Sequence, residues 1–214
     1  MSELRFGKSY IWVTWLTGLL AGEKHCQWAT WFRAHYTYSK LEGDFDAVKW
    51  REQHNRAVRE YVAELKRASW TVQVEAQNAF KVTGSSAVVS GKPDIVAYRD
   101  TDVLIVDIKT GEARDEHLWQ VLIYMHLLPM AWPELRGQIV RGEIKYNTRS
   151  VAVSPDELTP ARRQAINEII RDAAFDMPPE RTPSAQECRW CNIGPDDCPE
   201  RVASVERAGT TTEF

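Results

Sequence analysis

The spacing of hydrophobic positions predicts helices in the first third of the chain. Apolar and aromatic residues recur at helical intervals over 23–39 and again over 45–68, where Asp44 is placed to cap the second helix. An earlier apolar stretch, 10–21, loosely resembles an export signal. It is too short to cross a bilayer, which needs about 20 apolar residues. We expect it to form a buried helix or strand–helix element instead.

After residue 69 the pattern changes to the two-residue period that is typical of strands. The segment WTVQVEAQ (70–77) alternates apolar and polar residues, and AVVSGKPDIVAY (87–98) and DVLIVDIK (102–109) are two further apolar runs. The polar tetrapeptide 99–102 predicts a turn, so we expect the last two runs to form a hairpin. Two more strands are expected at 138–146 and 150–153, with helices at 116–128, ending before Pro129 and Pro133, and at 159–174.

This order of elements indicates the fold class. Helices, strands, one helix, strands, another helix and a tail predict an α/β fold, in which a mixed sheet is flanked by helices. The 214 residues, 43% of them hydrophobic, suffice for one compact domain. We therefore expect a single domain over 1–214, with an N-terminal helical region at 1–70, a core at 71–175 and a cysteine-rich tail at 176–214.

The composition restricts how the protein could bind nucleic acid. The formal net charge is −3, so any contact with DNA needs a local basic surface rather than a global positive field. Basic side chains of strands and loops are the candidates for phosphate contacts, although such residues are usually just solvated: Lys92, Arg114, Arg141, Lys145 and Arg149. The chain also has nine tryptophans, which fill the core or, for one or two of them, stack on unpaired bases.

The predicted hairpin carries the candidate chemistry. Asp107 and Lys109 lie near the end of an otherwise apolar strand, and the alternation of side chains puts them on the same face. Core packing does not explain them, since burying unpaired charges is costly. Asp94, at the start of the preceding strand, can bring a second carboxylate to the same place. Two carboxylates suit Mg²⁺ or Mn²⁺, and a lysine beside them can orient water or stabilise a phosphate transition state.

At this point the chain resembles a known family. GKPDIVAY followed by LIVDIKTG is similar to the PD-(D/E)xK nuclease motif, with Asp107 in place of the commoner Glu, and QVLIYMHLL is similar to the Q-x3-Y motif of the RecB-like branch. The resemblance implies a restriction-endonuclease-like fold. It implies catalytic roles for Asp94, Asp107 and Lys109, and a DNA-binding, lysine-supporting role for Gln120 and Tyr124.

The resemblance also implies further site residues. The metal ligands would be Asp94 and Asp107, the main-chain carbonyl of Ile108, and His54, which matches an upstream histidine of this branch. His35, His117 and His126 are alternatives to His54, and His117 shares the helix face of Gln120 and could touch DNA. Glu75 matches a further acidic position on the first strand, and its role is left open between the site and a solvated strand position.

Four cysteines suggest a second site. Cys188, Cys191 and Cys198 form C-x2-C-x6-C, and the fourth, Cys26, lies near the N-terminus. The spacing fits a metal site. From the residues alone it can be zinc, completed by Cys26 or His25, or a set of reduced buried cysteines. One early cysteine, in CQWATWFRAHY, followed by a nuclease core and three late cysteines resembles the layout of the iron–sulfur exonucleases related to the CRISPR-associated and AddB-type nucleases. That resemblance implies a 4Fe-4S cluster.

The expected function is divalent-metal-dependent hydrolysis of DNA. By the resemblance it is exonucleolytic on single-stranded ends, within CRISPR adaptation, repair, recombination or viral DNA metabolism, with a CRISPR integrase or a helicase as possible partner. We expect an intracellular protein that does not insert into a membrane. Two alternatives from other classes are a non-catalytic DNA-binding or assembly subunit with the same fold, and a zinc-stabilised interaction module. The intact Asp, Asp and Lys argue against the first, and the hairpin argues against the second.

Overall fold

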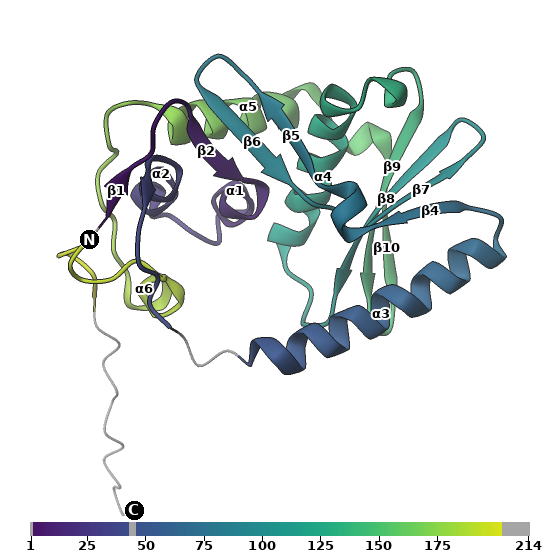
Figure 1. The fold of residues 1–214 in the computed structure, drawn as a ribbon, viewed down its shortest axis with the longest axis horizontal. Coiled ribbons are helices and arrows are strands. Elements are labelled where there is room, and N and C mark those ends of the chain that lie inside the picture. The colour runs from purple at the N-terminus through teal and green to yellow at the C-terminus, as the bar shows by residue number, and fades with distance from the viewer. Residues whose placement is uncertain (1, 43–45, 203–214) are drawn as a thin grey trace, which may run out of the picture.

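Five strands form the main sheet, in the order β10-β9-β8-β7-β4 (Figure 1). The computed structural model describes residues 2–42 and 46–202. Strands β8 and β9 are parallel and the other neighbours are antiparallel, so the sheet is mixed, as the sequence predicted. The strands are β4 (Thr71–Val74), β7 (Ile95–Arg99), β8 (Asp102–Lys109), β9 (Ile139–Tyr146) and β10 (Ser150–Val153). The expected hairpin is confirmed, with Arg99 opposite Asp102.

A second, three-stranded sheet was not predicted from the sequence. It has the order β2-β6-β5, with β2 (Ser9–Trp12) parallel to β6 (Ala87–Gly91) and β5 (Phe80–Thr83) antiparallel to it. The apolar run 87–98 is therefore two strands in two different sheets. Pro93 lies between them, and proline cannot donate a ladder hydrogen bond. A small pair, β1 (Glu3–Leu4) and β3 (Tyr36–Thr37), lies at the edge of this region.

Helices cover both faces of the main sheet (Figure 1). Helix α3 (Ala47–Arg67) packs its apolar side on β7 and β8, and α4 (Asp115–Ala131) packs on the opposite face, between the two sheets. The predicted strand–helix element at 10–21 is confirmed as β2 followed by the buried α1. The remaining helices are α1 (Val13–Leu20), α2 (Gln27–His35), α5 (Pro160–Ala174) and α6 (Ala185–Trp190), with short 3-10 turns η1 (Glu75–Asn78), η2 (Pro133–Leu135) and η3 (Pro155–Glu157).

Two details differ from the sequence predictions. Asp46 caps α3 by accepting a hydrogen bond from the Lys49 amide, whereas the expected cap, Asp44, lies outside the described residues. Helix α4 continues through Pro129 to Ala131. The proline falls in the last turn, where it removes one backbone hydrogen bond, and burial of its apolar neighbours offsets that loss.

In the part of the chain that the structure describes, no helix has the length and apolarity that a membrane crossing requires.

Candidate active site

The two carboxylates and the lysine meet at the ends of β7 and β8. Asp107 and Lys109 share one face of β8, as predicted, and Lys109 Nζ lies 2.8 Å from Asp107 Oδ2. Asp94 directly precedes β7, and its Oδ2 accepts a 2.7 Å hydrogen bond from the Ile108 amide. Asp107 is only 2% exposed. The hairpin therefore brings together the three residues that the sequence singled out.

Helix α4 supports this group from the opposite side. Gln120 donates to Asp107 Oδ1 (2.8 Å) and accepts from Lys109 Nζ (2.9 Å), so its amide ties the carboxylate to the lysine. It also lies 3.0 Å from the Tyr124 hydroxyl, one helical turn later, which confirms that the two side chains share a face. Both are buried, which suits a supporting role for the lysine. Direct contact of Gln120 and Tyr124 with DNA stays a prediction.

His54 reaches the same place from α3. Its Nε2 lies 3.2 Å from Asp94 Oδ2, and the side chain is largely buried. The hydrogen bond to Asp94 raises the pKa of His54 above its ordinary value, and burial opposes this shift. The imidazole also stacks on the indole of Trp50, with ring centroids 5.0 Å apart. The structure therefore places His54 beside Asp94, where a third ligand was expected.

Burial is the largest single influence on the pKa of both Asp107 and Lys109. It raises the pKa of Asp107 to about 6, and the neighbouring Asp94 adds to this shift while Lys109 opposes it. Burial lowers the pKa of Lys109, but the adjacent carboxylate more than compensates, and the net shift is upward. Within the described residues Asp107 Oδ2 is buried and makes no hydrogen bond of good geometry, although the Lys109 ammonium is close. A carboxylate in this position is poised to accept further positive charge.

Glu75 and His117 lie at the border of the site. Glu75 begins η1 with φ +43° rather than lying on the first strand, and its amide donates to the Asp94 carbonyl at 3.0 Å. The charge of Glu75 is close enough to contribute to the raised pKa of His54. His117 is buried, with its Nδ1 3.1 Å from the Tyr146 hydroxyl. Burial, with the charges of Lys109 and Arg114, lowers the pKa of His117 to about 4, so it is neutral near pH 7.

The other candidates have partners elsewhere. His35 contacts Ser9, and His126 contacts Asn167. Of the basic residues proposed for phosphate contact, two are ion-paired, Arg114 with Glu23 and Glu116, and Arg141 with Asp102, while Lys145 lies over the Tyr61 ring, Arg149 lies over the Tyr146 ring and Lys92 is exposed. Their phosphate contacts stay predictions.

Asn78 is a positioning residue that the sequence did not reveal. It is fully buried, and its side-chain amide donates to the carbonyls of Gln73 (3.1 Å), Pro93 (3.1 Å) and Asp94 (3.3 Å). These bonds fix the backbone on which the Asp94 carboxylate is carried. A single asparagine after an alternating run gives no signal of this role, because its acceptors become neighbours only when the chain folds.

The four cysteines lie close together in the folded chain, although Cys26 is distant in sequence from the other three. Cys26 directly precedes α2, Cys188 lies in α6, Cys191 directly follows α6, and Cys198 lies in the segment after it. Burial raises the pKa of the Cys198 thiol, and its three fellow cysteines are near enough to raise it further, while Arg181 lowers it. The structure thus brings the early cysteine to the three late ones.

Two polar side chains hold the cysteine-bearing segments together. The Glu187 carboxylate accepts from the amides of His25 (3.0 Å) and Cys26 (3.2 Å). The Arg201 guanidinium donates to the carbonyls of Cys188, Cys191 and Ile193, at 2.5–2.9 Å. Over residues 2–42 and 46–202, however, no three His, Cys, Asp or Glu side chains already stand in the arrangement of a metal site, either here or at the carboxylates.

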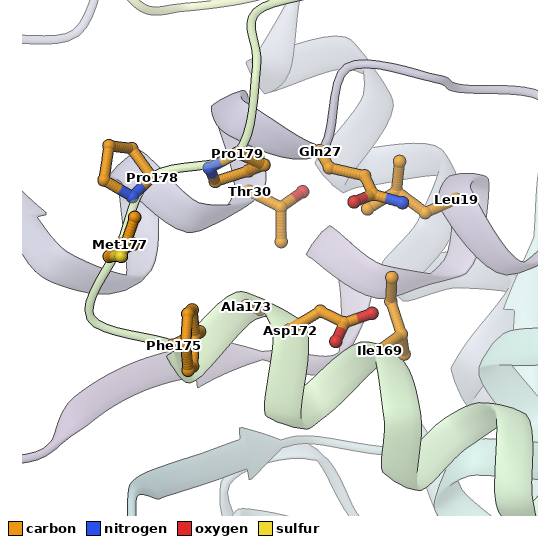
Figure 2. Close-up of a pocket in the computed structure, with 10 residues that line it drawn as sticks. All are labelled: Leu19, Gln27, Thr30, Ile169, Asp172, Ala173, Phe175, Met177, Pro178 and Pro179. Atoms are coloured by element: carbon orange, nitrogen blue, oxygen red, sulfur yellow. The ribbon is translucent and has the colours of Figure 1, made fainter.

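A separate hollow of about 460 Å³ lies between α1, α2, α5 and the segment after α5 (Figure 2). Leu19, Ile169, Phe175 and Met177 give it an apolar lining, and Asp172 is among its few polar groups. Its lining includes neither the carboxylate residues nor the cysteines. This hollow is therefore distinct from the candidate active site.

Comparison with known proteins assigns the motifs to a family. The family model described as "PD-(D/E)XK nuclease superfamily" matches residues 19–195, a span that includes His54, the hairpin, Gln120, Tyr124 and the first three cysteines. A search of curated proteins found no match. Among solved structures, the chain is similar to one described as "Crystal structure of SSO0001", with 14% identity, a TM-score of 0.41, and coverage of 87% of this chain and 85% of that chain.

Proposed function

The chain belongs to the PD-(D/E)XK nuclease superfamily, and from this premise we propose that it hydrolyses DNA phosphodiester bonds at Asp94, Asp107 and Lys109. Members of this superfamily are usually metal-dependent nucleases, and the mixed sheet with flanking helices fits their restriction-endonuclease-like fold. One observation carries the proposal: Gln120 joins the Asp107 carboxylate to the Lys109 ammonium at the end of the hairpin, beside Asp94. That arrangement supplies carboxylates that can bind a metal ion and an ammonium group that can stabilise a phosphate.

The residues at the hairpin fit a divalent cation in chemical kind. Lys109 pairs with Asp107, Asp94 lies beside them, and Asp107 Oδ2 is buried without a well-formed hydrogen bond. We assign Asp94, Asp107, His54 and the Ile108 carbonyl as the groups that would hold Mg²⁺ or Mn²⁺. Such a cation, when bound, acidifies water and neutralises charge that develops on the phosphate.

The protein's own side chains set the geometry of the reaction. Gln120 and Asp107 together fix the Lys109 ammonium, which is thereby oriented to donate to the attacking water or to a phosphate oxygen. Its raised pKa keeps the ammonium charged at neutral pH. Asn78 and the Ile108 amide hold Asp94 in place. The charge that stabilises the transition state is thus in position before substrate arrives.

The cysteines support a finer assignment to the RecB-like iron–sulfur branch. We propose that Cys26, Cys188, Cys191 and Cys198 hold a 4Fe-4S cluster, with zinc as the rival. Four thiols collect here, and the Arg33 guanidinium lies 3.5 Å from Cys191 Sγ. By the same resemblance the substrate would be a single-stranded DNA end, and the partners a CRISPR integrase or a helicase. The whole of 1–214 would then act as one nuclease domain.

A cleavage assay tests the proposal. Wild-type protein is incubated with end-labelled single- and double-stranded DNA in Mg²⁺, in Mn²⁺ and in chelator, beside Asp107→Ala. We expect cleavage by the wild type in metal and about a 1,000-fold or greater loss in the variant, because it loses both a ligand and the partner of Lys109. Equal cleavage by both would place the active site elsewhere. Inert wild-type protein under every metal would favour a non-catalytic subunit.

A further inference from the structure

The three-stranded sheet β2-β6-β5 has one face that the protein core does not use. Its inner face carries Ile11 and Val89, which belong to the main core, and helices α1, α4 and α5 contact its strands. Strand pairing puts Trp12, Ser90 and Lys81 in one row across the sheet, on the face opposite to these core residues. The outer face comprises Tyr10, Trp12, Lys81, Thr83, Val88 and Ser90.

Trp12 presents an indole to solvent on this outer face. It is 40% exposed, whereas Trp28 and Trp31 of α2 are 4% and 7% exposed. The ring packs edge-to-face with that of Tyr10, with centroids 5.9 Å apart and an interplanar angle of 66°. Such packing covers one face of an indole at most, so Tyr10 leaves the other face of Trp12 free to stack.

A lysine is held beside the aromatic pair. Lys81 Nζ lies 5.5 Å from the centroid of the Tyr10 ring. An indole with a free face next to a cation is the arrangement that binds single-stranded nucleic acid without regard to sequence. Every base has a face to stack, and every nucleotide has a phosphate to attract the cation.

The charge of the surrounding sheet is positive. Segments 5–21 and 78–93, which contain its three strands, include four basic residues, and neither segment has an Asp or a Glu: Arg5, Lys8, Lys81 and Lys92. Acidic side chains from other segments lie toward its two ends. Asp176 lines a hollow with Lys8 and Ser86, and Glu75 and Asp94 lie at the candidate metal site. A positive sheet in a chain of net charge −3 is the kind of local basic surface that DNA binding requires.

Strand β6 connects the outer face to the candidate active site. Ser90, which pairs with Trp12, precedes Asp94 by four residues, a chain length of at most about 14 Å. A DNA strand with one phosphate at Asp94 and Asp107 therefore has neighbouring nucleotides within reach of the outer face.

We propose that the outer face of β2-β6-β5 binds the unpaired strand next to the scissile phosphate, with Trp12 stacking one base and Lys81 contacting an adjacent phosphate. The inference rests on the proposed function, because it takes the carboxylates as the place where the scissile phosphate lies. It also gives a reason for strand choice. The bases of a duplex stack on one another inside the helix, so they cannot offer a face to Trp12, and an unpaired strand is preferred.

Binding assays separate stacking from simple charge attraction. A labelled thymidine oligomer and an abasic sugar–phosphate oligomer of equal length are titrated with the full chain in Ca²⁺, and binding is followed by fluorescence anisotropy. We expect Trp12→Leu to bind the thymidine oligomer about tenfold more weakly and the abasic oligomer with unchanged affinity. Trp12→Phe, which keeps an aromatic face, should retain most of the affinity for the thymidine oligomer.

Controls tie the effect to this position. Trp190 on α6 is also exposed and also has a cation near its ring, since the Arg189 guanidinium lies 5.3 Å from its centroid. Trp190→Leu should therefore bind both oligomers as the wild type does. Lys81→Gln should weaken binding of both oligomers equally and lower its salt dependence by roughly one phosphate contact. Lys66→Gln, an exposed position on α3, should change neither. Circular dichroism melts check that each variant is folded.

Photocrosslinking tests the same contact without a substitution. A thymidine oligomer that carries 5-bromouracil is irradiated with wild-type protein in Ca²⁺, and mass spectrometry locates the crosslinked residue. We expect a crosslink at Trp12, because the reaction requires an aromatic side chain in contact with the base. Crosslinks confined to other elements would overturn the proposal.

The results distinguish this inference from the proposed function. Wild-type binding of the thymidine oligomer by Trp12→Leu, or equal losses on both oligomers, would overturn the stacking role even if the wild type cuts DNA. A changed oligomeric state of Trp12→Leu on size exclusion, with unaltered DNA binding, would identify the outer face as a protein interface instead. Base-dependent binding that is lost in Trp12→Leu would support the proposal even if no cleavage were seen. Wild-type protein that neither binds nor cuts DNA would overturn both.

Discussion

At the scale of single residues, the site depends on two groups that hold protons more tightly in the folded chain. Burial raises the pKa of Asp107 to about 6, and the bond to Asp94 raises that of His54. A group with a raised folded-state pKa stabilises the fold below its ordinary pKa and loses this contribution as pH rises through the raised value. In metal-free protein, both residues therefore favour the folded state at acid pH and favour it less toward neutral pH.

A divalent cation should reverse this trend. It binds ionised Asp107 and neutral His54, so each proton that must leave costs about tenfold in affinity per pH unit below the pKa. We expect the rise in melting temperature caused by Mn²⁺ to grow between pH 5 and pH 8, by at least ~2–4 °C per pH unit over the titrating range. Differential scanning fluorimetry measures it. A shift that is independent of pH, or one that persists in Asp107→Asn, would contradict the assignment.

The sequence predicted which residues of the candidate site lie together, and it did so for a physical reason. Asp94, Asp107, Lys109, Gln120 and Tyr124 lie on a strand pair and a helix, whose regular periods fix which side chains share a face. The role of Asn78 could not be predicted, because its partners are backbone carbonyls that become its neighbours only when the chain folds. The period of a strand or helix predicts which face a side chain lies on, whereas its contacts depend on how the elements pack.

At the scale of elements, the close fit of α4 on β9 seats Gln120 against Asp107. Gly142 of β9 makes this fit possible, because a Cβ there would overlap the side chains of Val121 and Met125. Strands 138–146 and 150–153 and helix 159–174 were all predicted within a residue or so, since each has a clear period. The sheet β2-β6-β5 was missed because short strands distant in sequence pair only in the folded molecule.

Gly142→Ala should therefore destabilise the protein. We expect a loss of about 1–3 kcal/mol in the free energy of unfolding, as is usual for overpacking a rigid interface. Urea denaturation followed by circular dichroism measures this loss. Gly111→Ala is the matched control, because nothing lies within 4 Å of its added methyl, and it should change stability by under about 0.5 kcal/mol. Combining Gly142→Ala with Val121→Ala should cost less than the two changes added together; strict additivity would mean that the contact is not the cause.

At the scale of the whole molecule, the cysteine site ties the beginning of the chain to its end. Cys26 starts α2, and the other three cysteines follow the core. Sequence spacing identified the four thiols, but not Glu187 and Arg201, whose partners are backbone groups of distant segments. Every residue has backbone groups of this kind, so such links cannot be predicted from the pattern of residue types.

Replacing one thiol tests both the identity and the structural role of this site. Protein purified without oxygen should be brown with broad visible absorbance, and Cys188→Ser should lose the colour and melt roughly 5–10 °C lower, since a ligand that binds only the folded chain stabilises it. Trp190→Ser changes an exposed residue of the same helix and should behave as the wild type. A colourless wild type with stoichiometric zinc would establish the zinc alternative. Unchanged metal content in Cys188→Ser would remove that cysteine from the site.

The bonds from Glu187 to the His25 and Cys26 amides impose an order on biosynthesis. Their partners are separated by 162 and 161 positions along the chain. Because a ribosome delivers the N-terminus first, α2 emerges long before the carboxylate that anchors its first turn exists. The segments that carry the four cysteines can therefore meet only after the chain has been translated through Glu187 and the late cysteines.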